Sequence, residues 1–255
     1  MHLHPSASAT GASLISHDTL GSTNAEALSL ARAGERGPLW ITAARQTAGR
    51  GRRGSVWTSE PGNLYASLLL SDAVSAAHLP ELCFVVALAV RDAVAAAAPA
   101  IASELTLKWP NDLLLDGAKL AGILIEAESV GDKTATVAGI GVNCAHHPRD
   151  TGYRATALAA HGVSMAPDEL FRELSGVMVA RLAQWDRGAS FASIRAEWLS
   201  HAAGIGGDIV VRLPDRELSG KFESLDQMGR LMLRLPAGRL EAIAAGEIFP
   251  AQVSR

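Results

Sequence analysis

The chain has 255 residues, a formal net charge of -3, 48% hydrophobic residues and 19% charged residues. This composition is typical of a globular protein with ample apolar material for a core, and it gives no reason to expect nucleic acid as a partner. The two cysteines exclude a disulfide framework, residues 1–11 lack the lysine or arginine of a secretory signal, and the apolar run at 82–90 is too short to span a membrane. We therefore expect a cytoplasmic protein that does not bind membranes.

Taken in chain order, the sequence predicts a flexible tail at residues 1–12 and then a capping box, Thr23 to Glu26, that starts a helix ending near Gly34. Later strands and helices follow from hydrophobic periodicity and turn residues. Strands are expected at 39–45, 64–70, 105–108, 119–129 and 134–144, the last two joined by a Gly131-Asp132 turn. Helices are expected at 80–98, 167–186 and 191–201.

The segment after Gly204 changes character. Short alternating stretches separated by turn residues fill residues 209–243, which predicts a small β-barrel. We therefore expect a domain boundary near residue 205, with one domain at 13–205 and a second at 206–255.

Residues 46–57, QTAGRGRRGSVW, place three arginines among three glycines. A dinucleotide fingerprint would need a helix after Gly54, and a P-loop would need lysine where Ser55 stands, so the context excludes both. A solvated flexible loop is the alternative interpretation. Ordering such a loop costs about 1–2 kcal/mol per residue, whereas each charged hydrogen bond contributes about 1.5–3 kcal/mol. We expect the loop to be disordered in the free protein and to close over a phosphate or carboxylate.

Three further stretches are candidate partners of this loop. Residues 108–112, KWPND, place a cation, an aromatic ring, an amide and a carboxylate at a strand end, although an Asn-Asp turn beside a core tryptophan is the alternative. Strict alternation in the strand at 119–126 puts Lys119, Ala121 and Ile123 on one face. A lysine at the start of an apolar strand more often extends its ammonium into water. The glycine at 122, in contrast, favours close approach of a ligand or of another backbone.

The next strand places Gly139, Gly141 and Asn143 on one face, where the two glycines leave a flat slot. Packing glycines are an equal alternative. Ser22 to Asn24 is explained by helix capping, and a helix N-terminus is also a site for anions and polar ligands.

In this order, the segments resemble the biotin protein ligase family. The matching motifs are STN at 22–24, QTAGRGRRG at 46–54 with Trp57 behind it, KWPND at 108–112, KLAGIL at 119–124 and GIGVN at 139–143. The resemblance implies an α+β fold: a mixed β-sheet backed by helices, as in class II aminoacyl-tRNA synthetases, with an SH3-like C-terminal domain. Only about a dozen residues precede the first element, so the type without a DNA-binding domain is expected.

The resemblance also implies site residues. Biotin is expected to contact Ser22, Thr23, Asn24, Gln46, Arg50, Gly51, Arg52, Lys119, Gly122, Gly139 and Gly141. ATP or the adenylate is expected to contact Arg50, Trp57, Lys108, Asn111, Lys119 and Asn143. The catalytic candidates are Lys119, Arg52 and Asp112, of which Asp112 would orient or deprotonate the incoming amine. Cys144 is interpreted as structural.

The implied reaction is ATP-dependent attachment of biotin, through biotinoyl-5'-AMP, to a lysine of a biotin carboxyl carrier protein. ATP and biotin are the substrates, Mg²⁺ bridges the phosphates, and no fixed protein metal site is expected. The protein would be a monomer or a homodimer. A lipoate ligase is the nearest alternative, and a nucleic-acid-binding module that uses the arginines is a more distant one.

Overall fold

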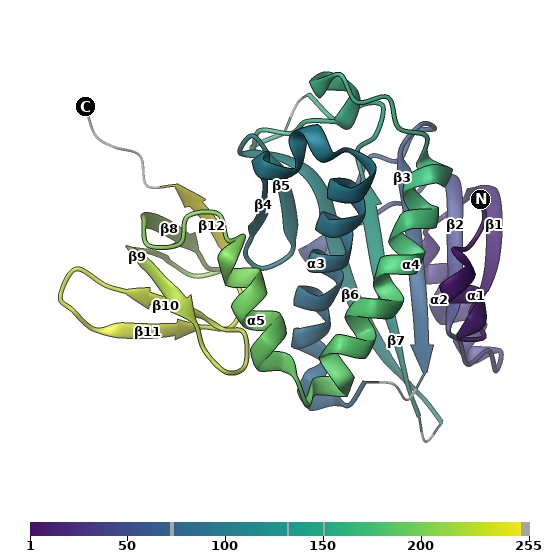
Figure 1. The fold of residues 1–255 in the computed structure, drawn as a ribbon. Helices are drawn as coiled ribbons and strands as arrows, with labels where there is room; N and C mark the ends of the chain where they lie inside the picture. Colours follow the sequence, from purple (N-terminus) through teal and green to yellow (C-terminus); the bar gives the residue numbers. More distant parts are fainter. Residues whose placement is uncertain (72–73, 132, 150, 251–255) are drawn as a thin grey trace.

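The computed structural model describes residues 1–71, 74–131, 133–149 and 151–250. A seven-stranded mixed sheet has the order β1-β2-β3-β7-β6-β5-β4, and a five-stranded sheet has the order β11-β10-β9-β8-β12 (Figure 1). The strands are β1 (Ser13–Leu20), β2 (Leu39–Gln46), β3 (Leu64–Ser71), β4 (Leu105–Lys108), β5 (Asp112–Leu115), β6 (Ala118–Val130), β7 (Lys133–Val142), β8 (Asp208–Arg212), β9 (Glu217–Leu225), β10 (Leu231–Arg234), β11 (Leu240–Ile243) and β12 (Glu247–Pro250). The helices are α1 (Pro5–Ala9), α2 (Thr23–Arg32), α3 (Leu79–Ala97), α4 (Pro167–Trp185) and α5 (Phe191–Ser200).

The elements predicted from periodicity are confirmed to within a few residues. Strands β1, β5 and β12 were not predicted. The predicted turn at Gly131-Asp132 lies partly outside the described residues.

Helices cover both faces of the large sheet. Apolar residues of α3 and α4 pack with one face of β3, β6 and β7 in the main core, and α2 packs on the other face in a smaller cluster that includes Ala27, Ile41 and Val137. Strand β7 serves both layers, since its side chains alternate between them. The apolar residues facing α2 give way to Gly139 and Gly141 farther along β7, so this face becomes shallow there.

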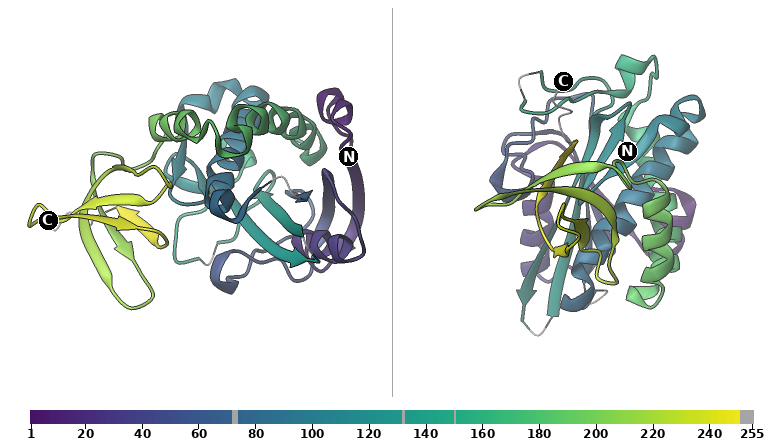
Figure 2. Two further views of the ribbon diagram at one scale, coloured as in Figure 1. Left: turned by 90° about the horizontal axis from the view of Figure 1, so that it is seen from below. Right: turned by 90° about the vertical axis from the view of Figure 1, so that its left-hand side faces the viewer.

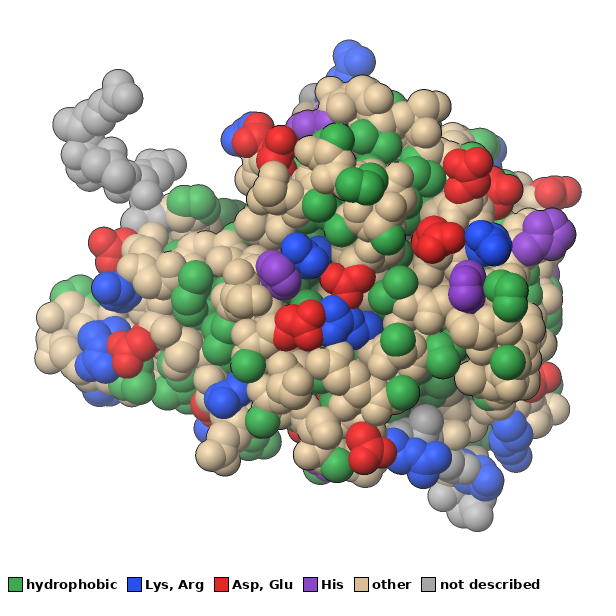
Figure 3. All heavy atoms as spheres, viewed as in Figure 1, with side chains coloured by type: hydrophobic (Ala, Val, Ile, Leu, Met, Phe, Trp, Pro, Cys, Tyr) green, Lys and Arg blue, Asp and Glu red, His purple; other side chains and the backbone are tan. Residues whose placement is uncertain are grey.

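Ion pairs also connect the outer helices α3, α4 and α5. Arg181 of α4 donates to Asp92 of α3, and its Nη1 donates to Glu197 Oε2 of α5 at 2.6 Å. Figure 3 shows acidic and basic side chains mixed at the centre of this helical face. Within the described ranges, no helix is long and apolar enough to cross a membrane.

The N-terminal residues, predicted to be a flexible tail, instead contain a helix that packs on the domain. Ala7 is completely buried, and the His4 amide donates to Ser175 Oγ of α4 at 2.9 Å. The His4 ring sits over Gly176, where a Cβ atom would come within 2.7 Å of it. Tertiary contacts of this kind override the polar, alanine-rich sequence that suggested a tail.

Two local predictions are also corrected. The N-cap of α2 is Ser22, whose Oγ accepts from the Ala25 amide, so Thr23 is not the cap residue. The register between β6 and β5 shifts by one residue. Leu114 pairs with Lys119 and Leu113 pairs with Ala121, so that Leu120 is an extra residue in β6. The extra residue is a β-bulge, which turns Lys119 away from the core side of Ala121 and onto the face of Gly122.

The C-terminal sheet is open, which corrects the predicted barrel: β11 and β12 are its two edges. Figure 2 shows this sheet to one side of the main domain, at the opposite end from the N-terminus. Trp109 Nε1 donates to the Gly229 carbonyl at 3.1 Å, and Gly229 packs against the Phe84 ring. These contacts hold the sheet beside the KWPND segment.

Candidate active site

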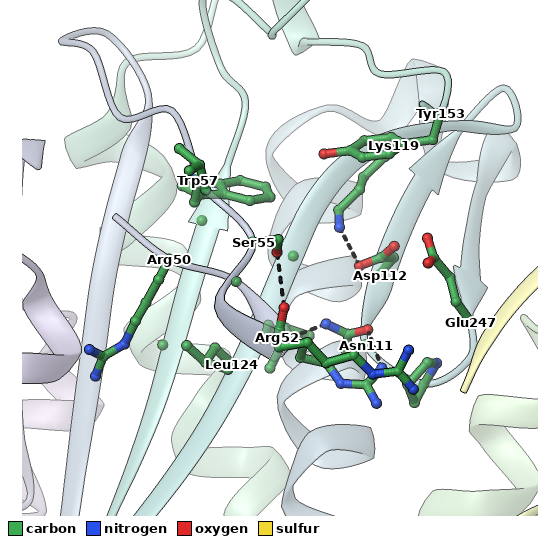
Figure 4. A pocket seen from close by; sticks show the side chains of 18 of the residues that line it. Arg50, Arg52, Ser55, Trp57, Asn111, Asp112, Lys119, Leu124, Tyr153 and Glu247 are labelled. Carbon is green, nitrogen blue, oxygen red and sulfur yellow. Dashed lines mark hydrogen bonds and ion pairs between the residues drawn. The ribbon is translucent and has the colours of Figure 1, made fainter. Parts of the chain in front are cut away.

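A cavity of about 620 Å³ lies between the arginine loop, the N-terminus of α2, strands β6 and β7, and strand β12. This volume is typical of a pocket that binds a small-molecule ligand or a cofactor. Fifteen of the predicted site residues line it, namely Ser22, Thr23, Asn24, Gln46, Arg50, Gly51, Arg52, Trp57, Lys108, Asn111, Asp112, Lys119, Gly122, Gly139 and Gly141. Figure 4 shows side chains from several of these segments converging on one space.

One end of the cavity is a buried polar network. Gln46 Oε1 accepts from the Thr23 amide at 2.8 Å and from Thr23 Oγ1 at 3.1 Å. The completely buried Ser67 places its Oγ 2.7 Å from Thr23 Oγ1 and 2.6 Å from Asn24 Oδ1. A side chain at position 139 would overlap the Asn24 amide, so only glycine fits there. Fixed donors and acceptors at this end suit a ligand with amide-like polar groups.

The middle of the cavity is a flat slot occupied by the Trp57 indole. A Cβ atom at Gly141 would lie 2.6 Å from the indole, and one at Gly122 would lie 2.9 Å from it. The two glycines are therefore required for the ring to lie against the sheet. Gly141 has the packing role that was the alternative to an open slot, and Gly122 is approached by a side chain. Trp57 Nε1 is buried and has no hydrogen-bond partner within the described part of the chain. A buried donor of this kind is available to a ligand acceptor.

Lys119 stands beside this slot and is held on three sides. Its Nζ lies 2.7 Å from Asp112 Oδ1, 5.4 Å from the Trp57 ring centroid and 5.2 Å from the Tyr153 ring centroid (Figure 4). The Lys119 amide also donates to the carbonyl of Arg154 at 2.8 Å, which places Tyr153 next to the lysine. A mostly buried ammonium in a fixed position is suited to stabilising developing negative charge.

The opposite end of the cavity, called the cationic end here after Lys108, is completed by the C-terminal sheet. Lys108 Nζ lies 5.0 Å from the Phe249 ring centroid, and Glu247 lies beside Asp112 (Figure 4). Burial lowers the pKa of Lys108, and the Asp112 and Glu247 charges act in the opposite direction. The cavity therefore runs from a polar end, past Lys119, to a second lysine.

The arginines of the loop point in different directions. Arg50 Nη2 donates to the Glu126 carboxylate at 3.0 and 3.2 Å, away from Lys119 (Figure 4). Arg52 Nη1 donates to Asn111 Oδ1 at 3.3 Å and to the Gly246 carbonyl at 3.4 Å. Arg53 is exposed in the left-handed region, with φ of 55°. The loop thus has one defined conformation here, and its disorder in the free protein stays a prediction.

Asn143 does not line the cavity, unlike the other predicted residues. Its side chain is buried and donates to the Thr156 carbonyl at 2.9 Å, so it supports the segment that follows β7. Its predicted contact with the adenylate is untested. Cys144 is buried, and burial raises its pKa to about 11, as is typical of a structural cysteine.

Four residues near the site were missed in the sequence. Ser67 was available as the polar residue inside the apolar strand at 64–70, and Glu126 as the charge at the end of KLAGILIE. Tyr153 and Phe249 carry no local signal, because each reaches the cavity only through the tertiary fold.

Comparison with known proteins bears on this arrangement. Residues 20–143 match the Biotin/lipoate A/B protein ligase family, and residues 204–249 match the Biotin protein ligase C terminal domain. The fold is similar to that of a biotin protein ligase from Aquifex aeolicus in complex with biotin and ATP. That match has a TM-score of 0.77 and 26% identity, and it covers 93% of this chain and 97% of the other.

Two relatives extend the match over most of the sequence. A biotin–[acetyl-CoA-carboxylase] ligase of Paracoccus denitrificans is 42% identical over 89% of this chain and 96% of the relative. A protein of the same description from Mycobacterium tuberculosis is 35% identical over 89% of this chain and 85% of the relative. The fold and the two family matches define a protein ligase of the biotin and lipoate type. The chain belongs to the biotin protein ligase family.

Proposed function

We propose that this protein attaches biotin to a specific lysine of a biotin carboxyl carrier protein in an ATP-dependent reaction of two steps, of which the first consumes the ATP. The observation that carries the proposal is the position of Lys119, between the polar network at one end of the cavity and Lys108 at the other. A carboxylate held at the polar end and a phosphate held at the cationic end would meet at this ammonium.

In the first step, a biotin carboxylate oxygen attacks the α-phosphorus of ATP, the bond to pyrophosphate breaks, and biotinoyl-5'-AMP forms. Lys119 neutralises the charge that both reacting groups bring together. Thr23, Asn24 and Gln46 orient the biotin, and the Trp57 indole forms a wall beside the nucleotide. Mg²⁺ would be bound to the ATP phosphates and would neutralise part of their charge, and Lys108 and Lys119 would face the phosphates from the protein.

In the second step, the lysine amine of the carrier attacks the carbonyl of the mixed anhydride and AMP leaves. The amine must lose a proton, and Asp112 is the carboxylate nearest to Lys119. The arginine loop keeps water from the anhydride until the amine arrives. The carrier as partner, a cytoplasmic location and a monomeric or dimeric state complete the proposal.

A lipoate ligase is the alternative, because the matching family description covers both acids. Pyrophosphate exchange separates the two: biotin, and not lipoate, should support exchange of labelled pyrophosphate into ATP. Calorimetry provides the binding test, first with biotin alone and then with biotin and Mg-ATP. We expect saturable binding in the first titration and much tighter retention in the second. Exchange that depends on lipoate, or no response to biotin, would overturn the proposal.

A further inference from the structure

We propose that Phe249, on strand β12 of the C-terminal sheet, is a positioning residue that holds the Lys108 ammonium at the cationic end of the cavity. This inference rests on the proposed function, because it assigns Lys108 to the phosphates of ATP. It gives the C-terminal sheet a defined part in the first step of the reaction.

The Phe249 ring is in contact with two cations from different parts of the fold. Lys108 Nζ of β4 lies 5.0 Å from the ring centroid, and the guanidinium carbon of Arg212, on β8, lies 4.7 Å from it. Arg212 pairs with Glu217, whose Oε1 accepts from its Nε at 2.7 Å. One of the two cations that contact the ring therefore belongs to the C-terminal sheet itself. A cation over an aromatic face is attracted by the negative charge of the ring.

Lys108 needs such a contact more than Lys119 does. Lys119 is held by the Asp112 carboxylate at 2.7 Å. The charges of Asp112 and Glu247 also act on Lys108, but within the described residues its ammonium forms no salt bridge with either and lies over an aromatic ring instead. A lysine side chain has a flexible four-carbon stem, and its ammonium samples several positions unless a neighbour selects one. Phe249 selects the position in which the ammonium faces the cavity that both residues line.

The backbone just before Phe249 also contacts a cation of the arginine loop. The carbonyl of Gly246 accepts from Arg52 Nη1 of the arginine loop at 3.4 Å, three residues before Phe249. Residues 246–249 thus contact cations from two motifs that lie far apart in the catalytic domain.

The test compares Phe249→Leu, which removes the ring, with Phe249→Tyr, which retains it, in biotin-dependent pyrophosphate exchange. Phe249→Leu should raise KM for ATP by about three- to tenfold, the range of a partly desolvated cation–π contact, and leave KM for biotin unchanged. Phe249→Tyr should leave KM for ATP at the value of the unmodified protein. In a Lys108→Met background, Phe249→Leu should have no further effect. Met228→Leu, an exposed change in the turn between β9 and β10 of the C-terminal sheet, is the matched control.

Unchanged KM for ATP in Phe249→Leu would overturn the inference, as would a rise that persists in the Lys108→Met background. An equal rise in both KM values would assign the ring a structural role only. Phe249→Met, which keeps side-chain volume without a ring, gives the same comparison if the leucine variant folds poorly. Failure of the proposed function is distinct, because the unmodified protein would then show no biotin-dependent exchange.

Discussion

Replacing Arg52 by glycine should let the activated intermediate escape. Arg52 holds the loop to the far wall through two hydrogen bonds, at 3.3 Å to Asn111 and 3.4 Å to the Gly246 carbonyl. Both are long, so together they contribute about 1–2 kcal/mol to the closed loop, which corresponds to about a 5- to 30-fold change in its open population. The Arg50 contact with Glu126 remains in the variant, so opening is partial.

The assay measures biotinoyl-5'-AMP released into solution and biotin attached to a bystander protein with exposed lysines. Arg52→Gly should raise both by about the same 5- to 30-fold factor. Arg53→Gly is the matched control, because it removes the same charge at an exposed position whose φ of 55° glycine adopts without strain. Unchanged carrier selectivity in Arg52→Gly, or equal leakage from both variants, would refute this role of Arg52.

Three further predictions concern the cavity. Lys119→Ala should abolish biotin-dependent pyrophosphate exchange while circular dichroism stays native, and normal exchange would remove Lys119 from the site. Gly141→Ala places a Cβ 2.6 Å from the Trp57 indole, so calorimetry should show binding of biotinoyl-5'-AMP weakened by about 1–3 kcal/mol; Gly21→Ala, which meets nothing within 4 Å, is the control. Because burial lowers the pKa of Lys108, its charge is lost as pH rises through a value below the ordinary lysine pKa of about 10.4, and KM for ATP should rise there. Lys108→Arg should keep KM for ATP flat over that interval, and an unchanged alkaline rise would exclude Lys108 as its origin.

The main helices and strands could be predicted from the sequence because their hydrophobic periods are long and regular, as in α3 and β7. The motifs also located most of the cavity wall, since STN, KWPND and KLAGIL each lie at the end of a strand or helix. Strand β5 was missed because it is only four residues long and begins at Asp112, within the Asn-Asp pair that suggests a turn.

Other features depend on the assembled fold. The bulge that turns Lys119 onto the face of Gly122 exists only in the pairing of β6 with β5, and strict alternation cannot anticipate it. Helix α1 packs on the domain because the small Gly176 of α4, about 170 residues away, leaves room for the His4 ring. Phe249 lies in the C-terminal sheet and contacts Lys108 of the large sheet, so the sequence around either residue does not predict this contact.

The central claim is that one cavity joins biotin to the α-phosphate beside Lys119 and is closed by the arginine loop. A crystal structure of the protein grown with biotinoyl-5'-AMP tests it most directly. We expect the acyl group against Thr23 and Asn24, the phosphate at Lys119, and residues 46–57 ordered over the compound. An acyl nucleotide bound elsewhere, or bound in the cavity with those residues absent from the electron density, would contradict the account.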